Sequence, residues 1–135
     1  VERLGAPAHP RDLENTDHRI VGFLSSRTGK IDPLILHGES EHIEIKGSYV
    51  LAVDDGNAYL EAGLAGLGVI ALPVYMAAAH QACGSLIPLF EQWRIHPMPL
   101  YLAFPPNRHV NARLRVFIDW IVELMQQHAP TSSNK

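Results

Sequence analysis

The chain has 135 residues, enough for one domain with a real hydrophobic core and too few for two of comfortable size. Hydrophobic residues make up 47% and charged residues 19%, which excludes a wholly disordered chain. The net charge is −3 at pH 7. A domain that binds nucleic acid through its phosphates usually has an excess of basic residues, and this chain has none. We therefore expect no direct DNA or RNA binding by this chain.

The single cysteine, Cys83, excludes an intramolecular disulfide framework and a cysteine-rich zinc site. We interpret it as a small apolar filler, a use compatible with a reducing cytoplasm. No signal peptide is predicted, because the first residues lack a basic segment followed by an apolar run. The apolar stretch 64–79 is interrupted by Gly66, Gly68 and Pro73 and is too short for a bilayer, which takes about 20 apolar residues. We expect a cytoplasmic protein without a membrane segment.

The first half of the chain predicts short strands separated by polar turns. Residues 1–19 are polar and carry a helical turn at residues 10–13. Runs of β-branched and aromatic residues, or of alternating polar and apolar residues, then indicate strands. These strands are expected over residues 19–24, 33–37, 42–47 and 49–53.

In the second half, helices alternate with strands. Residues 54–57, Asp-Asp-Gly-Asn, are typical of a helix start, because an Asp side chain accepts the free backbone N–H groups there. An Ala-rich helix follows and ends at Gly66 and Gly68. The remaining predicted elements are a buried strand over 69–72, a helix over 74–82, a short apolar segment over 86–90, a strand over 99–104 and a helix over 111–128. Strands alternating with helices indicate an α/β fold.

The last helix carries an apolar stripe at three- and four-residue spacing, made by Leu114, Ile118, Ile121 and Met125. Such a stripe requires a partner surface, either inside this chain or on another copy. Residues 131–135 form a polar tail that we expect to be frayed.

Three segments resemble catalytic or nucleotide-binding motifs without matching them. Residues 22–30 have six residues between the glycines, where a phosphate-binding loop has four, and lack the hydroxyl residue after Lys30. Residues 63–68 are glycine-rich but end a helix, whereas a dinucleotide fingerprint opens one. Residues 38–42 have His42 where a nucleophile elbow has its closing glycine. No nucleophile, base and oxyanion site can be assembled, so we expect no enzyme and no cofactor.

The eight histidines invite a metal site, and His37, Glu39 and His42 lie close in sequence. No H-E-x-x-H pattern is present, and the other histidines stand apart in different segments. We therefore expect surface histidines and no metal.

Four stretches, in order, resemble the effector-binding domain of LysR-type transcription regulators. They are residues 1–13 (VERLGAPAHPRDL), 53–58 (VDDGNA) with 65–73 (AGLGVIALP), 84–93 (GSLIPLFEQW), and 99–105 (PLYLAFP) with 115–121 (RVFIDWI). The resemblance covers nearly the whole chain, and the ordered set is more specific than any one piece.

This resemblance implies a periplasmic-binding-protein-like fold of type 2, with two α/β lobes around an effector cleft. Residues 1–98 would form most of the second lobe, a mixed sheet flanked by helices, truncated at its N-terminal side. Residues 99–130 would be the strand and helix that return to the first lobe. The DNA-reading domain and most of the first lobe would be missing, so that DNA is bound only through the missing N-terminal domain. The unpartnered last helix then predicts a homodimer, with exchange of C-terminal segments as one route to it.

The effector wall is predicted from residues at strand ends and helix starts, where open α/β sheets bind ligands. It comprises Ser25, Ser26, Asp55, Asn57, Pro73 and Tyr75. Asp55 has two compatible roles there, as helix cap and as ligand contact. Hydroxyl, amide and backbone N–H groups suit a small polar or carboxylated effector.

The leading interpretation is thus a ligand-sensing regulatory domain of a transcription factor that binds a small-molecule effector and mediates oligomerisation. Two alternatives stay open: a solute-binding domain without a transcriptional role, and a fragment that serves only for oligomerisation. The identity of the effector does not follow from the sequence.

Overall fold

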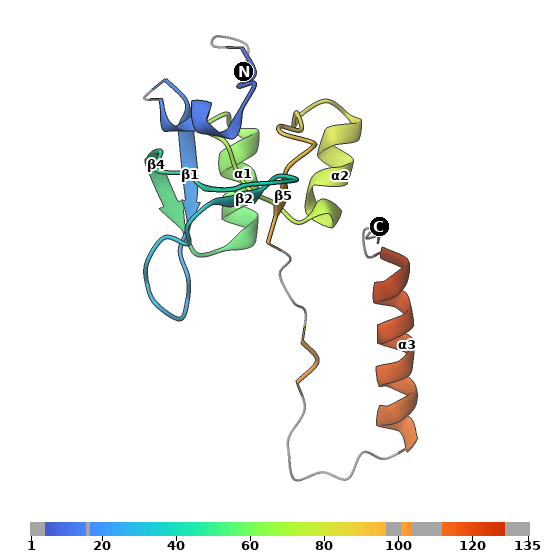
Figure 1. The fold of residues 1–135 in the computed structure, drawn as a ribbon. Coiled ribbons are helices and arrows are strands. Elements are labelled where there is room, and N and C mark those ends of the chain that lie inside the picture. The colour runs from blue at the N-terminus through green and yellow to red at the C-terminus, as the bar shows by residue number, and fades with distance from the viewer. Residues whose placement is uncertain (1–4, 16, 97–100, 104–111, 129–135) are drawn as a thin grey trace. The chain divides into compact units, whose positions relative to one another are not determined.

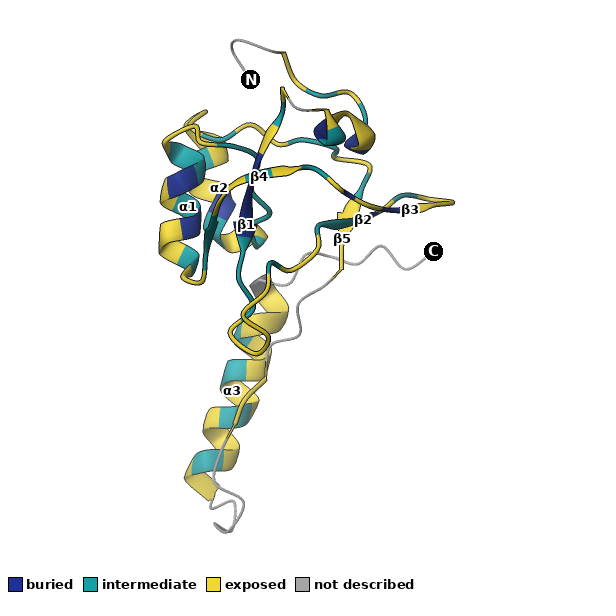
Figure 2. Cartoon of the chain, turned by 90° about the vertical axis from the view of Figure 1, so that its left-hand side faces the viewer, coloured by how far each residue is buried: buried dark blue, intermediate teal, exposed yellow. Residues whose placement is uncertain are grey.

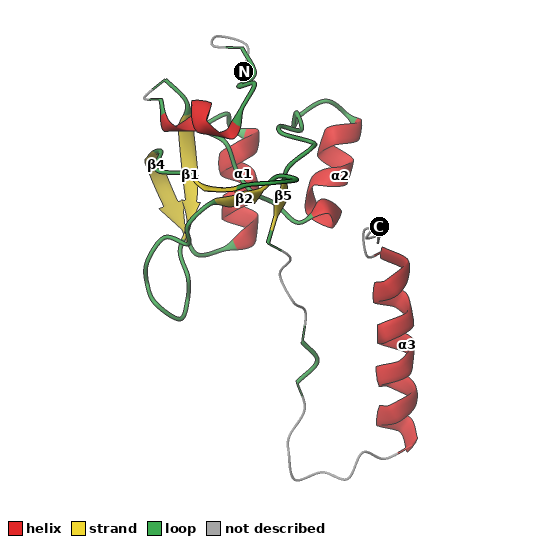
Figure 3. Ribbon diagram, in the orientation of Figure 1, coloured by secondary structure: helices red, strands yellow, loops and turns green. Residues whose placement is uncertain are grey.

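The computed structural model describes residues 5–15, 17–96, 101–103 and 112–128 (Figure 1). The chain divides into two compact units, Val1–Pro97 and Met98–Lys135. The first unit contains the 3-10 helix η1 (Pro10–Glu14), strands β1 (Arg19–Phe23), β2 (Ile35–His37), β3 (His42–Glu44), β4 (Ser48–Val53) and β5 (Arg94–Ile95), and helices α1 (Gly56–Leu64) and α2 (Val74–Ala82). The second unit contains α3 (Ala112–His128). The α/β class expected from the sequence is confirmed (Figure 3).

Strands β1 and β4 form a parallel pair, in which Arg19 faces Ser48 and Phe23 faces Val53. On the other side of β1, Ile20 makes an isolated parallel bridge to Val69. The predicted strand over residues 69–72 is therefore wrong beyond this bridge, and its residues are half-buried. The reason is a tertiary contact, because the backbone N–H of Ala71 donates to the hydroxyl of Tyr59, twelve residues away on α1, at 3.0 Å rather than to β1.

Strands β3, β2 and β5 form a separate antiparallel sheet. A tight turn joins β2 to β3, with the Gly38 N–H donating to the Glu41 carbonyl at 2.8 Å. Parallel and antiparallel pairs are both present, as expected, but in two sheets instead of one mixed sheet. Strand β5 was not predicted, because two residues are too few to show a periodic pattern.

The core lies on both faces of the parallel pair (Figure 2). On one face, Val21 packs with Tyr59 and Ala62 of α1. On the other face, Ile20 packs with Leu13 of η1 and with the buried side of the antiparallel sheet. Helix α1, the parallel pair and the antiparallel sheet with η1 thus form successive layers, as the alternation of Ile20 and Val21 along one strand requires.

Cys83 is exposed at the C-cap of α2. The prediction of an apolar filler is wrong, because the left-handed Gly84 (φ 76°) ends the helix at the surface. A hydrogen bond with Ser85 lowers the pKa of the Cys83 thiol.

The last helix begins at Ala112 and ends at His128, close to the predicted 111–128. The apolar stripe is only partly covered within what the structure describes: Leu114, Ile118 and Ile121 are half-buried, and Met125 is 39% exposed. The strand predicted over residues 99–104 is absent at 101–103, and its other residues lie outside the described part. The polar tail at 131–135 lies outside it as well. No helix among the described residues is long and apolar enough to cross a membrane.

Candidate functional site

The carboxyl ends of the parallel segments converge at one edge of the sheet. β1 and β4 run in the same direction, and residue 69 pairs with β1 in that direction too. Ser25 follows β1, Asp55 follows β4, and Pro73 follows the segment that begins at Val69. The ends of β1 and β4 are joined directly, since the Leu24 N–H donates to the Val53 carbonyl at 2.7 Å. We call this region the carboxyl edge.

Ser25 and Ser26 begin a loop that closes on itself. The Ser25 N–H donates to the Lys30 carbonyl at 2.9 Å, and the Gly29 N–H donates to the Ser25 carbonyl at 2.8 Å. Ser25 is half-buried and Ser26 is exposed. Neither hydroxyl has a hydrogen-bond partner among the residues that the structure describes. Both are therefore available to a polar ligand.

Asp55 caps α1. Its Oδ1 accepts hydrogen bonds from the N–H groups of Asn57 and Ala58, both at 2.9 Å. The capping role expected from the sequence is confirmed. Because this carboxylate already neutralises part of the helix N-terminus, the attraction of α1 for a second anion is reduced. Asn57, in the first turn, is exposed.

Helix α2 begins directly after Pro73, which is half-buried and contributes no side-chain cap. Its start lies near that of α1: a Cβ added to Gly56 would stand 3.8 Å from the Met76 methyl. Tyr75 is 76% exposed. The structure thus brings Ser25, Asp55 and Pro73 to one edge through their backbones, whereas Tyr75 extends into solvent.

Tyr59 is the residue of this region that sequence reasoning missed. It comes from α1 and is 6% exposed. Its hydroxyl donates to the Val21 carbonyl at 3.2 Å and accepts from the Ala71 N–H at 3.0 Å. Its ring meets Phe23 edge-on, with centroids 5.4 Å apart. Tyr59 thereby fixes α1 and the 69–72 segment against β1, and the only sequence signal for it is an aromatic residue in an Ala-rich helix.

Burial raises the pKa of the Tyr59 phenol, so the hydroxyl stays protonated and keeps both hydrogen bonds at neutral pH. Within the described ranges, no group of three or more His, Cys, Asp or Glu side chains is arranged to hold a metal ion. The carboxyl edge presents the hydroxyls of Ser25 and Ser26, the amide of Asn57 and the carboxylate of Asp55.

Comparison with protein families decides the class. The family of the LysR substrate binding domain matches residues 2–126. The chain belongs to this family. The resemblance drawn from the ordered motifs is thus confirmed, and membership of the LysR family implies a periplasmic-binding-protein-like fold.

Named relatives of this LysR domain are transcription regulators. The HTH-type transcriptional regulator YhjC of Escherichia coli is 32% identical over 130 residues, which is 95% of this chain and 42% of that protein. An HTH-type transcriptional repressor of Pseudomonas aeruginosa is 24% identical over 125 residues, 93% of this chain and 39% of the relative. The probable HTH-type regulator SinR of Salmonella typhimurium is 27% identical over 124 residues, 90% and 38% respectively. The LysR domain described here thus spans about two fifths of the length of these curated relatives.

Proposed function

We propose that this chain is the ligand-sensing regulatory domain of a LysR-type transcription regulator and binds a small-molecule effector at the carboxyl edge. The observation that carries this proposal is the convergence of three parallel segments, whose ends bring Ser25, Asp55 and Pro73 together. The proposed contacts are Ser25, Ser26, Asp55, Asn57, Pro73 and Tyr75. DNA would be bound by another part of the regulator, which would work in the cytoplasm.

The chemistry of the carboxyl edge favours a small polar effector over a strongly anionic one. Two free hydroxyls and the exposed Asn57 supply donors and acceptors. Asp55 places a negative charge at the same edge, so a ligand with a hydroxyl or amide group is favoured over a phosphate.

A metabolite panel screened by thermal shift and followed by calorimetry tests this proposal. A true effector loses about 1 kcal/mol of binding free energy in Ser25→Ala or Asn57→Ala, the net worth of one hydrogen bond. The matched control is Ser40→Ala, an exposed serine in the turn between β2 and β3. Equal binding by the parent and both site variants would exclude the carboxyl edge as the effector site.

Self-association is the second part of the proposal, and the observation that favours it is the apolar side of α3. Phe117 and Trp120 are 47% and 54% exposed, and their rings lie 5.9 Å apart. We expect a homodimer that covers this side, with exchanged C-terminal segments as one form of it. Light scattering should show that Ile118→Asp lowers the dimer fraction while Asp119→Asn leaves it unchanged. A monomer at every concentration would refute dimerisation without affecting the effector site.

A further inference from the structure

A hollow of about 360 Å³ lies on the first unit, lined by Ala8, Phe90, Glu91, Gln92 and Trp93. Its volume falls in the range of small-molecule sites, about 300–1,000 Å³. One wall comes from Ala8, which precedes η1, and the other from residues 90–93, which directly precede β5. It shares no residue with the carboxyl edge.

The wall contributed by Phe90 has a strained backbone. Phe90 is the non-glycine residue with a positive φ, 56°, among those that the structure describes. Aromatic residues adopt this conformation rarely, at a cost that the surroundings must offset. The turn is closed by the Trp93 N–H, which donates to the Phe90 carbonyl at 2.7 Å. Phe90, Glu91, Gln92 and Trp93 are thus held in one tight turn around the hollow.

Trp93 is held in place from two sides. The Gly38 backbone lies so close that an added Cβ would stand 3.1–3.3 Å from three indole carbons. The His9 ring meets the indole at 89°, with centroids 5.3 Å apart. A side chain larger than hydrogen at position 38 would therefore displace the indole.

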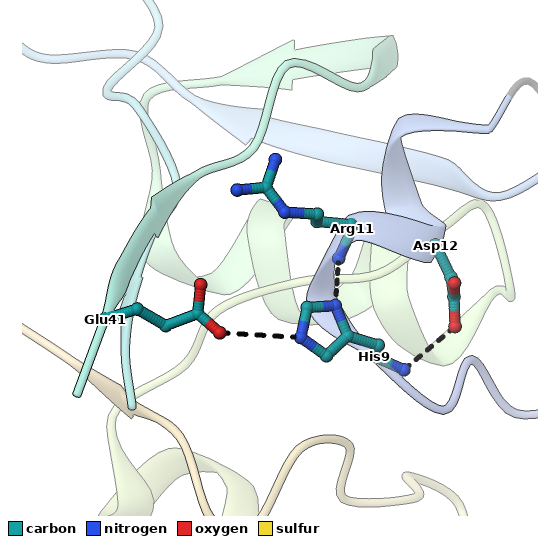
Figure 4. A network of polar contacts seen from close by, with 4 residues as sticks. All are labelled: His9, Arg11, Asp12 and Glu41. Carbon is teal, nitrogen blue, oxygen red and sulfur yellow. Dashed lines mark hydrogen bonds and ion pairs between the residues drawn. The ribbon is translucent and has the colours of Figure 1, made fainter. Parts of the chain in front are cut away.

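His9 is itself fixed by polar contacts (Figure 4). Its Nδ1 accepts from the Arg11 N–H at 3.2 Å, so in the neutral ring the proton resides on Nε2. Nε2 lies 3.9 Å from Glu41 Oε1. The indole of Trp93 is consequently a preorganised wall of the hollow, and a ligand does not have to order it on binding.

The side chains that line the hollow favour a cation as its ligand. Tryptophan is the best aromatic partner of an ammonium group, and Trp93 lines the hollow together with Phe90, while both also pack against the core around Ile20. Glu91 is exposed and has no ion-pair partner among the described residues, so its carboxylate is available. Gln92 supplies an amide that can accept a hydrogen bond. An anion would instead meet the charge of Glu91.

From this juxtaposition we infer a second ligand site, which takes a small organic cation with its ammonium group against Trp93 and paired with Glu91. It is separate from the proposed effector site. Trp93 directly precedes β5, so a bound cation also stabilises the start of that strand.

The test uses the full chain carrying Trp120→Phe, which leaves Trp93 as its only tryptophan. Choline is the probe, and its uncharged isostere 3,3-dimethylbutan-1-ol is the matched ligand. Choline should change the Trp93 fluorescence saturably, with a Kd of roughly millimolar size for so few atoms. The isostere should bind at least about fivefold more weakly, because it lacks the cation–π and carboxylate interactions.

Variants locate the site. Glu91→Gln should weaken choline binding about threefold, the effect of one exposed ion pair. Glu61→Gln, an exposed glutamate of α1, and Asn57→Ala, at the carboxyl edge, should leave it unchanged. Circular dichroism checks that each variant folds. Absence of saturation, equal binding of the isostere, or loss in Asn57→Ala instead of Glu91→Gln would each overturn the inference.

Discussion

Replacing Tyr59 by Phe removes the hydroxyl group that links α1 to β1 and to the 69–72 segment by hydrogen bonds. The ring stays, so the edge-on contact with Phe23 and the packing on Val21 are kept. What is lost is the hydrogen bond to the Val21 carbonyl and the bond from the Ala71 N–H. The Ala71 N–H then remains in a half-buried place without its partner.

The two hydrogen bonds set the size of the effect. Each contributes about 1 kcal/mol net, and an unsatisfied buried donor costs about 1–3 kcal/mol. Because Ala71 is only half-buried, we expect a loss of about 2 kcal/mol in the free energy of unfolding. In a unit of this size that lowers the Tm by roughly 10 °C.

Urea unfolding of the parent and of Tyr59→Phe measures this loss. The matched control is Tyr49→Phe, a half-buried tyrosine whose hydroxyl has no hydrogen bond to the described residues. It should change stability by less than about 0.5 kcal/mol. Equal losses in the two variants would refute the structural role of the Tyr59 hydroxyl.

Four further outcomes are expected. Because burial raises the folded-state pKa of Tyr59 above its ordinary value near 10, the stability it contributes is complete below that value and falls as the pH rises through the raised pKa. The stability difference between parent and Tyr59→Phe should therefore shrink in alkaline urea titrations, and a constant difference would contradict this. Asp55→Ala removes the cap of α1 and should cost about 1 kcal/mol in thermal melts, with Asp54→Ala as the control. Gly68→Ala would place a Cβ 2.7 Å from the Arg19 carbonyl oxygen; a loss of about 1–3 kcal/mol and faster amide exchange at Val69 should follow. Leu13→Ala empties a fully buried position and should cost about 2–5 kcal/mol in urea unfolding, whereas a loss under 1 kcal/mol would place Leu13 outside the core.

Features that depend on neighbouring residues could be predicted from the sequence. The helix over 74–82 was predicted with its observed bounds, because Pro73 starts it and Gly84 follows its end. The cap by Asp55 is likewise a local hydrogen-bond choice. The positions of Ser25 and Asp55 at the ends of strands were also predicted, and they share an edge because β1 and β4 run parallel.

Features decided by distant partners could not be predicted. The segment 69–72 has the composition of a buried strand, yet the Tyr59 hydroxyl takes the N–H of Ala71. Strand β5 exists only because β2 offers it an edge. Tertiary packing decides the exposure of the Tyr75 side chain and the contacts of Trp93 with Gly38 and His9. No local sequence pattern encodes such packing.

Because a chain is synthesised from its N-terminus, β1 is made before the segments with which it forms parallel pairs. β2 and β3 are joined by a short turn and can pair as soon as both have left the ribosome. The end of β1 is met early, since the Asp32 N–H donates to the Phe23 carbonyl at 2.8 Å, but its start pairs only later, because Arg19 pairs with Ser48 and Ile20 with Val69. Until then, the unpaired edges of β1 and the apolar side chains of Ile20 and Val21 are open to wrong partners. A nascent chain arrested before residue 69 should therefore be the form that chaperones hold and that aggregates most readily.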